Sequence, residues 1–452
     1  MSKDAYRTTN PFFHRGPIRD SAYFYNRKKE VKRALEMLGK GQSVAVIGPR
    51  KIGKTSLLFH ISQPEVMQQH GLDPARHLVV YFNCEGLGSI KLEEFYALIL
   101  EEIAGRAAQH GVHLAIPERP TSYLEFERVL RKVFKQKLKL ALLLDEFELL
   151  GENREWGTEL LRGLRALATK FDIAHLTVSQ RQLPAFTEHS PFFNIFLLLK
   201  MGLFDESESR ELIEESLTKA GAMFPPEAIN RILGLGGGHP FFLQVAGYWA
   251  LELQATKGAP LESKDFHILA QTVRGQVVSH FEYYWRQLTP QERYVLAALP
   301  FTQSEEIYRE QLEALACLCL IVKEDGRYRY FSPLFRDFVR RQEVENLLQA
   351  EPFVLTLTHQ RTLLGEESLP LSATQFNLLS YLMERQGQVV SNEELDREVM
   401  WTSPEEQQKY EYLGDGRLKS AIRELRRALG DKADCIVNKR GVGYMFQILA
   451  EE

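Results

Sequence analysis

The stretch Val44-Ala45-Val46-Ile47-Gly48-Pro49-Arg50-Lys51-Ile52-Gly53-Lys54-Thr55-Ser56-Leu57-Leu58 decides how the first half of this chain folds. Its apolar start predicts a buried strand, the Gly-x4-Gly-Lys-Thr segment predicts a phosphate-binding loop, and the residues that follow suit a helix. The two glycines allow successive N–H groups to point into one concavity. In that arrangement Lys54 supplies a positive charge for the phosphates and Thr55 a hydroxyl for Mg²⁺. We therefore predict that residues 48–56 bind ATP or ADP together with Mg²⁺.

A second motif supplies the acidic groups that such a loop requires. The apolar run 138–144 ends in Asp145-Glu146. A buried parallel strand would carry Asp145 to the sheet edge beside the phosphate loop, where it can orient a Mg²⁺-bound water. Glu146 would then align or deprotonate the attacking water. We predict Lys54, Asp145 and Glu146 as the catalytic residues, with Thr55 and Asp145 at the metal.

The elements around these motifs predict an α/β fold with a central parallel sheet. Further strands are expected at 78–82, 174–180 and 196–199, with helices at 92–108 and 123–135. The strand at 78–82 comes between the phosphate-loop strand and the strand that ends in Asp145. This extra strand, together with the acid that follows Asp145, resembles the additional-strand, catalytic-glutamate group of P-loop ATPases.

The composition is that of an ordinary soluble protein, with 44% hydrophobic and 26% charged residues. A length of 452 residues predicts two to four domains. The net charge of −4 argues against a basic coat over the whole surface but permits a local basic face. Four cysteines without C-x-x-C spacing suggest neither a disulfide framework nor a zinc knuckle. Without a signal peptide or an apolar run of about 18 residues, we expect a cytoplasmic protein with no membrane partner.

Some segments near the predicted nucleotide allow two interpretations. Residues 1–20 show no periodicity and predict an arm on the surface. Phe24-Tyr25, followed by Asn26-Arg27, could stack on an adenine or could instead anchor the next helix to the core. Ser179-Gln180, at the end of a predicted strand, could sense the γ-phosphate or could be a polar strand end.

Beyond Glu206 the apolar periodicity is wholly helical, and Gly236-Gly237-Gly238-His239-Pro240 precedes another helix. The Phe-x-Asn-Arg box, the phosphate loop, Asp145-Glu146 and this Gly-Gly-His-Pro segment together resemble archaeal-type ATPases of the STAND/AAA+ group, over about residues 20–345. The resemblance implies an ATPase core at 21–204 and a helical lid at 205–285. It also implies nucleotide contacts from Tyr25 and Arg27 of the box and from His239 and Pro240 of the lid. Asn26 departs from the group, which usually has glycine at that position.

Residues 286–345 predict a small winged helix. Its recognition segment carries Glu305, Glu306, Glu310 and Glu313 against a single Arg309. Phosphate groups would be repelled by such a surface. We therefore interpret this domain as an accessory regulatory part of the ATPase.

The C-terminal part of the chain has a different pattern. Ser372 with Gln375, and Ser391 with Glu394, form capping boxes that open two helices. A third helix over 417–429 has an apolar stripe opposite a basic face, and residues 436–446 predict a β-hairpin with basic residues at its tip. Over 351–452 there are 12 basic and 17 acidic residues, yet over 414–445 there are 8 basic and 4 acidic. The positive charge is therefore concentrated on this helix and hairpin.

These features resemble the OmpR/PhoB-type winged-helix DNA-binding domain, over about residues 352–449 within a domain at 350–452. Its characteristic Leu-Arg-x-x-Leu-Gly and Arg-Gly-x-Gly-Tyr segments are both present. The resemblance implies base-edge contacts from the helix and phosphate contacts from the helix and wing. Tyr444 could contact the DNA backbone or anchor the hairpin in the core. The predicted DNA-binding residues are Arg417, Lys419, Ser420, Arg423, Arg427, Lys439, Arg440 and Tyr444.

Together these patterns predict an ATP-dependent signalling switch that regulates transcription. In the OmpR/PhoB-type family a phosphorylated receiver domain usually provides the input, and here an ATPase takes its place. The expected partners are double-stranded DNA and other copies of this chain in an ATP-dependent homo-oligomer. The loop from Trp401 to Leu413 corresponds to one that can touch RNA polymerase in the family, although here it is longer and more acidic. The alternatives are a DNA-remodelling or mobile-element ATPase without promoter specificity, and a defence-type sensor whose winged helices bind protein.

Overall fold

The computed structural model describes the chain except for residues 1–9, 13–15, 88, 117–120, 152–156, 181–194, 300–301, 345–346, 351, 358–359, 366, 401–415 and 449–452. The chain divides into two compact units. The first comprises the residues up to Val277 together with Cys317–Cys319, and the second comprises Val278–Ala316 and the residues from Leu320 onward. The phosphate loop therefore belongs to the first unit and the basic C-terminal helix to the second.

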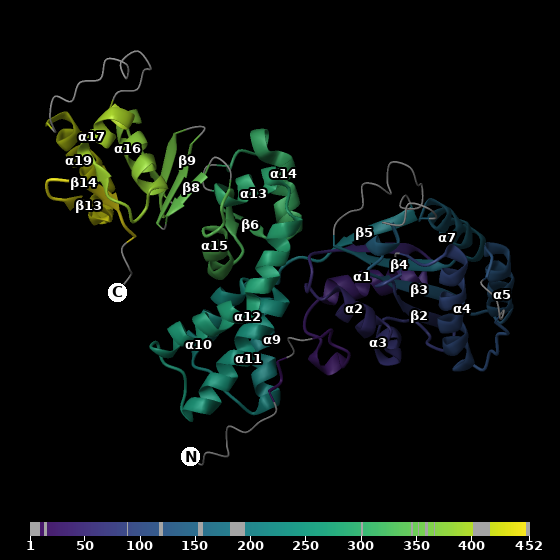
Figure 1. Cartoon of the computed structure of the whole chain (residues 1–452). Helices are drawn as coiled ribbons and strands as arrows, with labels where there is room; N and C mark the ends of the chain where they lie inside the picture. The colour runs from purple at the N-terminus through teal and green to yellow at the C-terminus, as the bar shows by residue number, and fades with distance from the viewer. Residues whose placement is uncertain are drawn as a thin grey trace. The chain divides into compact units, whose positions relative to one another are not determined.

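A five-stranded parallel sheet forms the centre of the first unit (Figure 1). Its strands are β1 (Ser43–Ile47), β2 (His77–Asn83), β3 (Lys139–Asp145), β4 (Ala174–Ser179) and β5 (Phe196–Lys200). They follow the order β2-β3-β4-β1-β5, and every pairing is parallel. The extra strand predicted at 78–82 is confirmed as β2, at the edge beside β3. The parallel arrangement brings the carboxyl ends of all strands to one edge of the sheet.

Helices cover both faces of the sheet because successive side chains of a strand point to opposite faces. On β3, Leu140, Leu142 and Leu144 join one apolar cluster, whereas Ala141 and Leu143 join the other. The first cluster includes side chains of α4, α5 and α7, and the second includes side chains of α1, α2 and α3. The helices of this core are α1 (Lys28–Gly39), α2 (Lys54–Ile61), α3 (Pro64–Gln69), α4 (Leu92–Ala108), α5 (Tyr123–Lys135), α6 (Glu148–Gly151) and α7 (Gly157–Phe171). The helices predicted at 92–108 and 123–135 are confirmed.

A helical lid follows the sheet. It consists of α9 (Glu206–Ala220), α10 (Pro226–Gly236), α11 (Pro240–Lys257) and α12 (Asp265–Gln287), and the division between the two units falls within α12. Gly238 joins α10 to α11 with a φ of +74°, and a Cβ there would meet the carbonyl oxygen of Phe204 at 2.5 Å. The N–H of Phe204 donates to the carbonyl oxygen of Gly238 at 2.8 Å. Glycine is therefore required where the lid contacts the chain that leaves the core.

The N-terminal arm, expected on the surface, packs into the first unit around Phe12. Phe12 is 3% exposed, and a Cβ on Gly247 of α11 would meet its ring at 2.5 Å. Asn10 donates from Nδ2 to the carbonyl oxygen of Tyr248 at 3.1 Å and to Glu252 at 2.9 Å. The expectation is wrong for Phe12, because a missing side chain on α11 makes room for its ring, which the arm's own sequence does not reveal. Gly16, Pro17, Arg19 and Asp20 are exposed, as expected.

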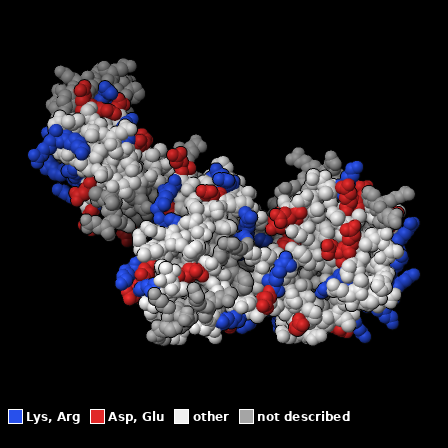
Figure 2. Space-filling view, turned by 60° about the horizontal axis from the view of Figure 1, so that its bottom comes forward, with Lys and Arg blue, Asp and Glu red and all other residues white. Residues whose placement is uncertain are grey.

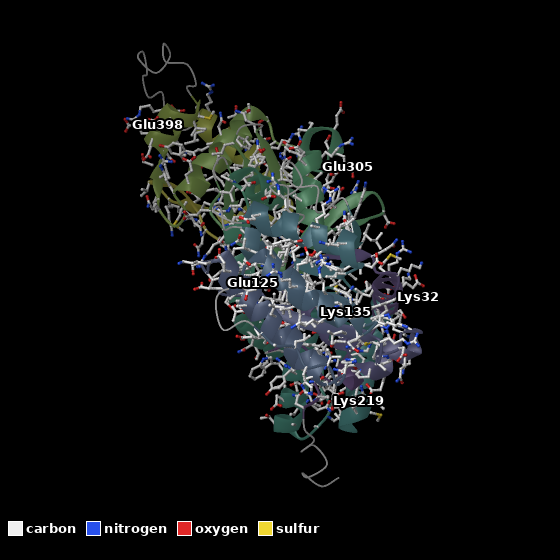
Figure 3. All side chains as sticks on the ribbon, turned by 90° about the vertical axis from the view of Figure 1, so that its right-hand side faces the viewer. Lys32, Glu125, Lys135, Lys219, Glu305 and Glu398 are labelled. Carbon is white, nitrogen blue, oxygen red and sulfur yellow. The ribbon has the colours of Figure 1, made fainter. Side chains whose placement is uncertain are left out.

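The second unit contains the accessory winged helix predicted at 286–345. Its elements are α13 (Pro290–Ala297), α14 (Glu305–Cys317), β6 (Ile321–Glu324), β7 (Arg327–Tyr330) and α15 (Pro333–Val339), and β6 and β7 form an antiparallel hairpin. Glu305, labelled in Figure 3, accepts hydrogen bonds from Lys323 and from the hydroxyl of Tyr328, both at 2.6 Å. The start of α14 is therefore bound to the hairpin.

A C-terminal winged-helix domain completes the second unit. Its elements are β8 (Leu347–Ala350), β9 (Phe353–Thr356), β10 (Arg361–Leu364), β11 (Glu367–Leu369), α16 (Ala373–Glu384), β12 (Val390–Ser391), α17 (Asn392–Leu395), the π-turn η5 (Asp396–Met400), α19 (Gly416–Leu429), the 3₁₀ turn η6 (Gly430–Cys435), β13 (Ile436–Lys439) and β14 (Gly443–Phe446). Ser372 and Ser391 accept N–H hydrogen bonds at the starts of α16 and α17, as predicted. The antiparallel sheet β11-β10-β9-β8 begins slightly before the predicted boundary at 350 because β8 pairs with β9. In the described part of the chain, no helix combines the length and apolar character needed to cross a membrane.

Candidate nucleotide site and DNA-binding surface

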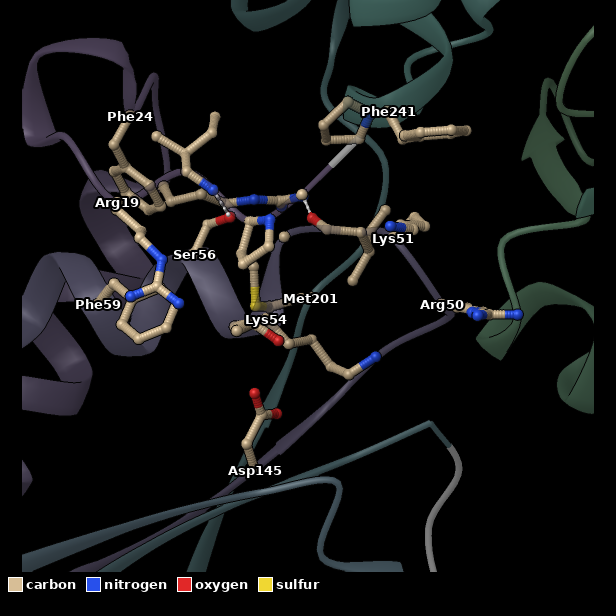
Figure 4. Close-up of a pocket in the computed structure, with 18 of the residues that line it drawn as sticks. Arg19, Phe24, Arg50, Lys51, Lys54, Ser56, Phe59, Asp145, Met201 and Phe241 are labelled. Atoms are coloured by element: carbon tan, nitrogen blue, oxygen red, sulfur yellow. Dashed lines mark hydrogen bonds between the residues drawn. The ribbon is translucent and has the colours of Figure 1, made fainter. Parts of the chain in front are cut away.

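A pocket of about 380 Å³ in the first unit lies where β1, β2 and β3 end. Small-molecule sites typically have volumes of about 300–1,000 Å³. Several parts of the chain line it, among them the arm at 16–19, the box at 24–27, the phosphate loop at 50–56, the strand ends with Asn83 and Asp145, and the lid with Pro240 and Phe241 (Figure 4). The phosphate loop and the acidic motif therefore face the same cavity.

The phosphate loop has the close packing that its glycines permit. A Cβ on Gly48 would meet the carbonyl oxygen of Met201 at 2.6 Å, and Gly53 has a φ of +104°. Lys54 is 7% exposed and donates from Nζ to the carbonyl oxygens of Gly48 at 2.7 Å and Pro49 at 2.9 Å. Burial lowers the pKa of Lys54, and nearby carboxylates, Glu148 first among them, oppose that shift. The ammonium group therefore lies within the loop, beside the cavity.

The two acids that end and follow β3 lie opposite this loop. Asp145 is 2% exposed, and its Oδ1 accepts the N–H of Glu146 while its Oδ2 accepts the hydroxyl of Tyr81, both at 3.1 Å. Glu146 has a left-handed φ of +50°, and burial raises the pKa of its carboxyl. Both acids line the pocket with Lys54 and Thr55. The structure thus brings together the residues predicted for phosphate and Mg²⁺ chemistry.

Glu148 is a third acid near the loop, and the sequence patterns did not indicate it. Its Oε1 accepts the N–H of Gln180 at 3.1 Å, just after β4. Burial raises the pKa of Glu148 to about 6, with a further contribution from the charge of Glu146. Glu148 therefore joins the end of the predicted sensor strand to the acidic segment.

Mg²⁺ fits this pocket as part of a nucleotide complex. Among the described residues, no three His, Cys, Asp or Glu side chains are grouped as a metal-binding cluster. Thr55 and Asp145 offer hard oxygen atoms to the same cavity. Mg²⁺ in phosphate-binding sites typically uses one or two protein oxygens together with phosphate and water. The residues present therefore suit Mg²⁺ that arrives with a nucleotide.

The aromatic box holds the lid. Lys219 of α9, labelled in Figure 3, lies 4.8 Å from the ring centre of Tyr23 and 4.6 Å from that of Tyr25. It also donates to the hydroxyl of Tyr25 at 3.0 Å and to the carbonyl oxygen of Ala22. Phe24 stacks on His60 of α2 with 4.1 Å between ring centres. Although Tyr25 lines the pocket, these contacts favour the anchoring interpretation over adenine stacking.

Arg27 joins three parts of the pocket wall. It is 4% exposed and donates to the carbonyl oxygens of Gly202 at 2.7 Å and Ile52 at 3.3 Å. Its guanidinium group also lies 4.4 Å from the ring centre of Phe204. The box arginine therefore connects the phosphate loop with the start of the lid.

Three predicted nucleotide contacts remain. Pro240 lines the pocket, whereas His239 and Ser179 do not. His239 is 2% exposed at the start of α11, with its ring 4.5 Å from that of Phe242. Ser179 is 7% exposed, and its carbonyl oxygen accepts the N–H of Gly48 at 3.3 Å. These two residues therefore differ from the prediction, because one side chain packs inside the lid and the other residue supports the loop through its backbone.

Other pocket residues carried no motif. Arg19, Phe59, Tyr81, Asn83 and Glu85 all line the cavity. Two weak signals were available, since Phe59 lies three residues after Ser56 on the same helix and Asn83 ends a strand parallel to β3. Neither signal distinguishes a pocket residue from an ordinary core residue without the fold.

The basic face of α19 is exposed, as predicted. Leu418, Ile422 and Leu425 are buried in the core of the C-terminal domain. Arg417, Lys419, Arg423 and Arg427 are exposed, and Ser420 is half-buried. Figure 2 shows lysine and arginine atoms gathered on one side of this domain. The helix therefore presents positive charge on the side opposite its apolar stripe.

The hairpin β13–β14 extends this surface. Lys439 and Arg440 are exposed at its tip, and Arg426 of α19 donates to the carbonyl oxygen of Ile436 on β13. Tyr444 is 5% exposed within the core cluster, which favours its role as the hairpin anchor. The loop from Trp401 to Leu413, which corresponds to one that can touch RNA polymerase in the family, lies outside the described residues.

Comparison with known families agrees with this architecture. Residues 37–303, more than half of the chain, match the family described as Novel STAND NTPase 2. This chain belongs to that family. Residues 365–446 of this STAND NTPase match a second family, described as Transcriptional regulatory protein, C terminal. The predicted resemblance to STAND ATPases and to OmpR/PhoB-type domains is therefore confirmed.

A curated relative covers only the C-terminal domain. The phosphate regulon transcriptional regulatory protein PhoB of Escherichia coli is 32% identical over 105 residues, which make up 23% of this chain and 43% of PhoB. The STAND NTPase thus spans less than half the length of the curated relatives it matches.

Solved structures resemble the ATPase part. The Walker-type ATPase PABY2304 of Pyrococcus abyssi gives a TM-score of 0.55 at 17% identity, over 72% of this chain and 99% of that one. The Aeropyrum pernix ORC2 protein gives 0.52 at 16% identity, over 74% and 97%. At such identities the likeness shows the P-loop ATPase fold alone. The STAND NTPase therefore joins an NTPase of this fold to a DNA-binding domain of the transcription-regulator type.

Proposed function

We propose that this STAND NTPase is an ATP-dependent switch that regulates transcription, with the nucleotide state controlling oligomerisation and the presentation of the C-terminal DNA reader. One observation carries the proposal: a pocket lined by Lys54, Thr55, Asp145 and Glu146 occurs in the same chain as an exposed basic helix and wing of the OmpR/PhoB type.

Lys54, Thr55, Asp145 and Glu146 each have a chemical role in this proposal. Lys54 holds the β- and γ-phosphates, and Thr55 and Asp145 hold or orient the Mg²⁺ that comes with them. Glu146 aligns or deprotonates the attacking water, and the raised pKa of its carboxyl brings it closer to the range that suits a base at neutral pH. In such a switch, hydrolysis serves only to return the ATP-bound protein to the ADP-bound state, so a slow rate is sufficient.

Contacts between the pocket wall and the lid support the switch. Arg27 bonds to Ile52 of the phosphate loop and to Gly202 before the lid, while Asn26 donates from Nδ2 to the carbonyl oxygen of Glu208 on α9 at 2.7 Å. A nucleotide that moves the loop would therefore move the lid through the same residues. The resulting lid position is proposed to set oligomerisation.

At the DNA, Arg417, Lys419, Ser420 and Arg423 are proposed to face the major-groove edge, and Arg427, Lys439 and Arg440 the phosphates. A single reader of this size buries about 600–1,000 Å² and binds weakly. An ATP-dependent oligomer would bind repeated sites more tightly because it raises the effective concentration of readers. RNA polymerase is a further proposed partner, through the loop at 401–413.

The decisive test maps the DNA bound by the full-length protein with ATP, with ADP and without nucleotide. Sequence-specific binding to repeated sites that strengthens with ATP supports the proposal. Sequence-blind coating that grows with DNA length would favour a DNA-remodelling ATPase, and no DNA binding at any salt concentration a sensor that binds protein. Equal affinity of ATP-bound protein and of a 347–452 fragment, which keeps β8, for single and repeated sites would show that the ATPase does not control DNA recognition.

A further inference from the structure

The N-terminal arm forms one wall of the nucleotide pocket by running along helix α2. The N–H of Ile18 donates to Oγ of Ser56 at 3.0 Å, and the guanidinium carbon of Arg19 lies 4.6 Å from the ring centre of Phe59. Ser56 and Phe59 are three residues apart, so they lie on the same face of the helix. Both line the pocket, as do Ile18 and Arg19. The arm therefore contacts the helix that follows the phosphate loop on its pocket side.

Phe59 extends this contact to the acidic motif. Its ring centre lies 4.8 Å from that of Tyr81 on β2, with 41° between the ring planes. The hydroxyl of Tyr81 then donates to Oδ2 of Asp145 at 3.1 Å. Figure 4 shows Arg19 beside Phe59, and Asp145 with its carboxylate pointing toward Lys54. We call the series Arg19, Phe59, Tyr81 and Asp145 the arm ladder.

The arm ladder restricts how the carboxylate of Asp145 can turn. Its Oδ1 accepts the N–H of Glu146 and its Oδ2 accepts the hydroxyl of Tyr81. A carboxylate oxygen can accept two hydrogen bonds, so each oxygen keeps one position for a water on Mg²⁺. The hydroxyl of Tyr81 is the donor in this bond, because a carboxylate such as that of Asp145 has no proton to give and can only accept. The Tyr81 hydroxyl and the N–H of Glu146 therefore set the orientation of both free positions together.

We propose that Tyr81 is a positioning residue for the Mg²⁺ of this site, and that Arg19 of the N-terminal arm and Phe59 of α2 hold its ring in place. The inference rests on the proposed nucleotide function. Partners that orient a metal ligand typically change metal affinity 10- to 100-fold. The arm thus acts on the Mg²⁺ side of the site, through contacts that no phosphate-loop motif includes.

A purely structural role would have a different signature. If Tyr81 only filled the space beside Asp145, its hydroxyl would affect folding but not the dependence of ATP affinity on Mg²⁺. Tyr81→Phe removes the hydroxyl and keeps the ring against Phe59. Arg19→Ala removes the cation at the other end of the arm ladder, and because Arg19 is exposed, this change leaves the core intact. Tyr123→Phe is the matched control, because Tyr123 packs on Tyr96, 6.2 Å between ring centres, and does not line the pocket.

The experiment titrates ATP into the full-length protein by calorimetry, in EDTA and at increasing Mg²⁺ concentrations. For Tyr81→Phe we expect the Mg²⁺ concentration at half-maximal effect to rise about tenfold, while ATP affinity in EDTA stays unchanged. Arg19→Ala should shift the same midpoint about two- to fivefold, as expected for an exposed cation–π contact. Tyr123→Phe should change neither quantity.

Three results would overturn the inference. An unchanged Mg²⁺ midpoint in both Tyr81→Phe and Arg19→Ala would show that the arm ladder does not act on the metal. Equal loss of ATP affinity with and without Mg²⁺ would show that Tyr81 supports the pocket only. If the wild-type chain bound no ATP at all, the proposed nucleotide function itself would fail, and the Mg²⁺-free titration distinguishes that outcome from the other two.

Discussion

The nucleotide pocket and the basic surface of the C-terminal domain both use charged side chains, but they are built in opposite ways. In the pocket, Lys54 is 7% and Asp145 is 2% exposed, and the wall comes from the arm, the loop, two strand ends and the lid. On the basic surface, Arg423 and Arg440 are exposed, and they come from one helix and one hairpin. Buried charges interact strongly with their few partners, whereas exposed charges are screened by water and salt. Substitutions in the pocket should therefore have large, specific effects, and those on the surface smaller, salt-dependent ones.

The largest effect is expected for Lys54→Ala. It deletes the buried charge that faces the phosphates and leaves the apolar core intact, so ATP binding should be lost. Calorimetric titration of ATP measures this directly. The control is Lys132→Ala, which removes an exposed lysine from α5. Unchanged ATP affinity in Lys54→Ala would refute the assignment of the phosphate loop.

Glu146→Gln should separate binding from turnover. It keeps the shape of the side chain and removes the base, so ATP should still bind while hydrolysis slows by about 10²- to 10⁴-fold. Phosphate release at saturating ATP measures the rate, and Glu101→Gln, an exposed change on α4, is the control. A hydrolysis rate equal to that of the wild type would mean that another group orients the water.

On the basic surface, Arg423→Ala and Arg440→Ala should differ in kind. Arg423→Ala should cost about 1–3 kcal/mol on the preferred site and relax the sequence preference, because it removes a base-edge contact. Arg440→Ala should weaken binding to all DNA sequences about equally. It should also reduce the slope of log affinity against log salt concentration by about one, because one phosphate contact is lost. Binding to specific and scrambled DNA at several salt concentrations measures both. The control is Arg397→Ala, because the Arg397 side chain already pairs with Glu398 at 2.8 Å. If Arg423→Ala and Arg440→Ala relaxed the sequence preference equally, the assignment would be contradicted.

The effect of burying a charged group in the first unit can be tested with Glu148, by measuring stability at different pH values. Its pKa rises from 4.5 to about 6 in the folded protein. The unfolded chain therefore loses this proton first, and the folded state loses stability as pH rises from about 4.5 to about 6. Glu148→Gln keeps an oxygen for the N–H of Gln180, so above pH 6 it should stabilise the ATPase unit by about 1–2 kcal/mol. Thermal unfolding at about pH 8 and pH 4.5 measures this gain, which should vanish at the lower pH; a gain independent of pH would show that the Glu148 carboxyl is not the cause.

The smallest effect is expected for Tyr444→Phe. Because Tyr444 is 5% exposed in the core cluster, its ring should anchor the hairpin, and loss of the hydroxyl should change DNA affinity less than about twofold. A fluorescence anisotropy titration measures the affinity. A tenfold loss with an unchanged unfolding temperature would restore the other interpretation, in which Tyr444 contacts the DNA backbone.

Local patterns were sufficient for much of both sites. The phosphate loop, Asp145-Glu146 and the basic stripe of α19 each depend on residues close together in the chain, and the structure places them as expected. Predictions were less successful where a role depends on distant partners. Tyr25 lines the pocket, but no local pattern indicated that its hydroxyl also accepts a hydrogen bond from Lys219 of the lid, nearly two hundred residues away. His239 was a candidate for the nucleotide, but its ring packs against Phe242 inside the lid.

The sequence by itself determined the types of the elements and the chemistry of the two motifs, because helix and strand periodicity and the geometry of a phosphate loop are local properties of the chain. Only the tertiary structure decided which residues complete the pocket. Arg19, Phe59 and Tyr81 lie far apart in the sequence and carry no motif. They form a series of contacts that ends at Asp145, because parallel strands end at one edge, beside the helix that the arm follows. Burial of Asp145 at that edge then makes its hydrogen bonds stronger than the same residue types would make in water.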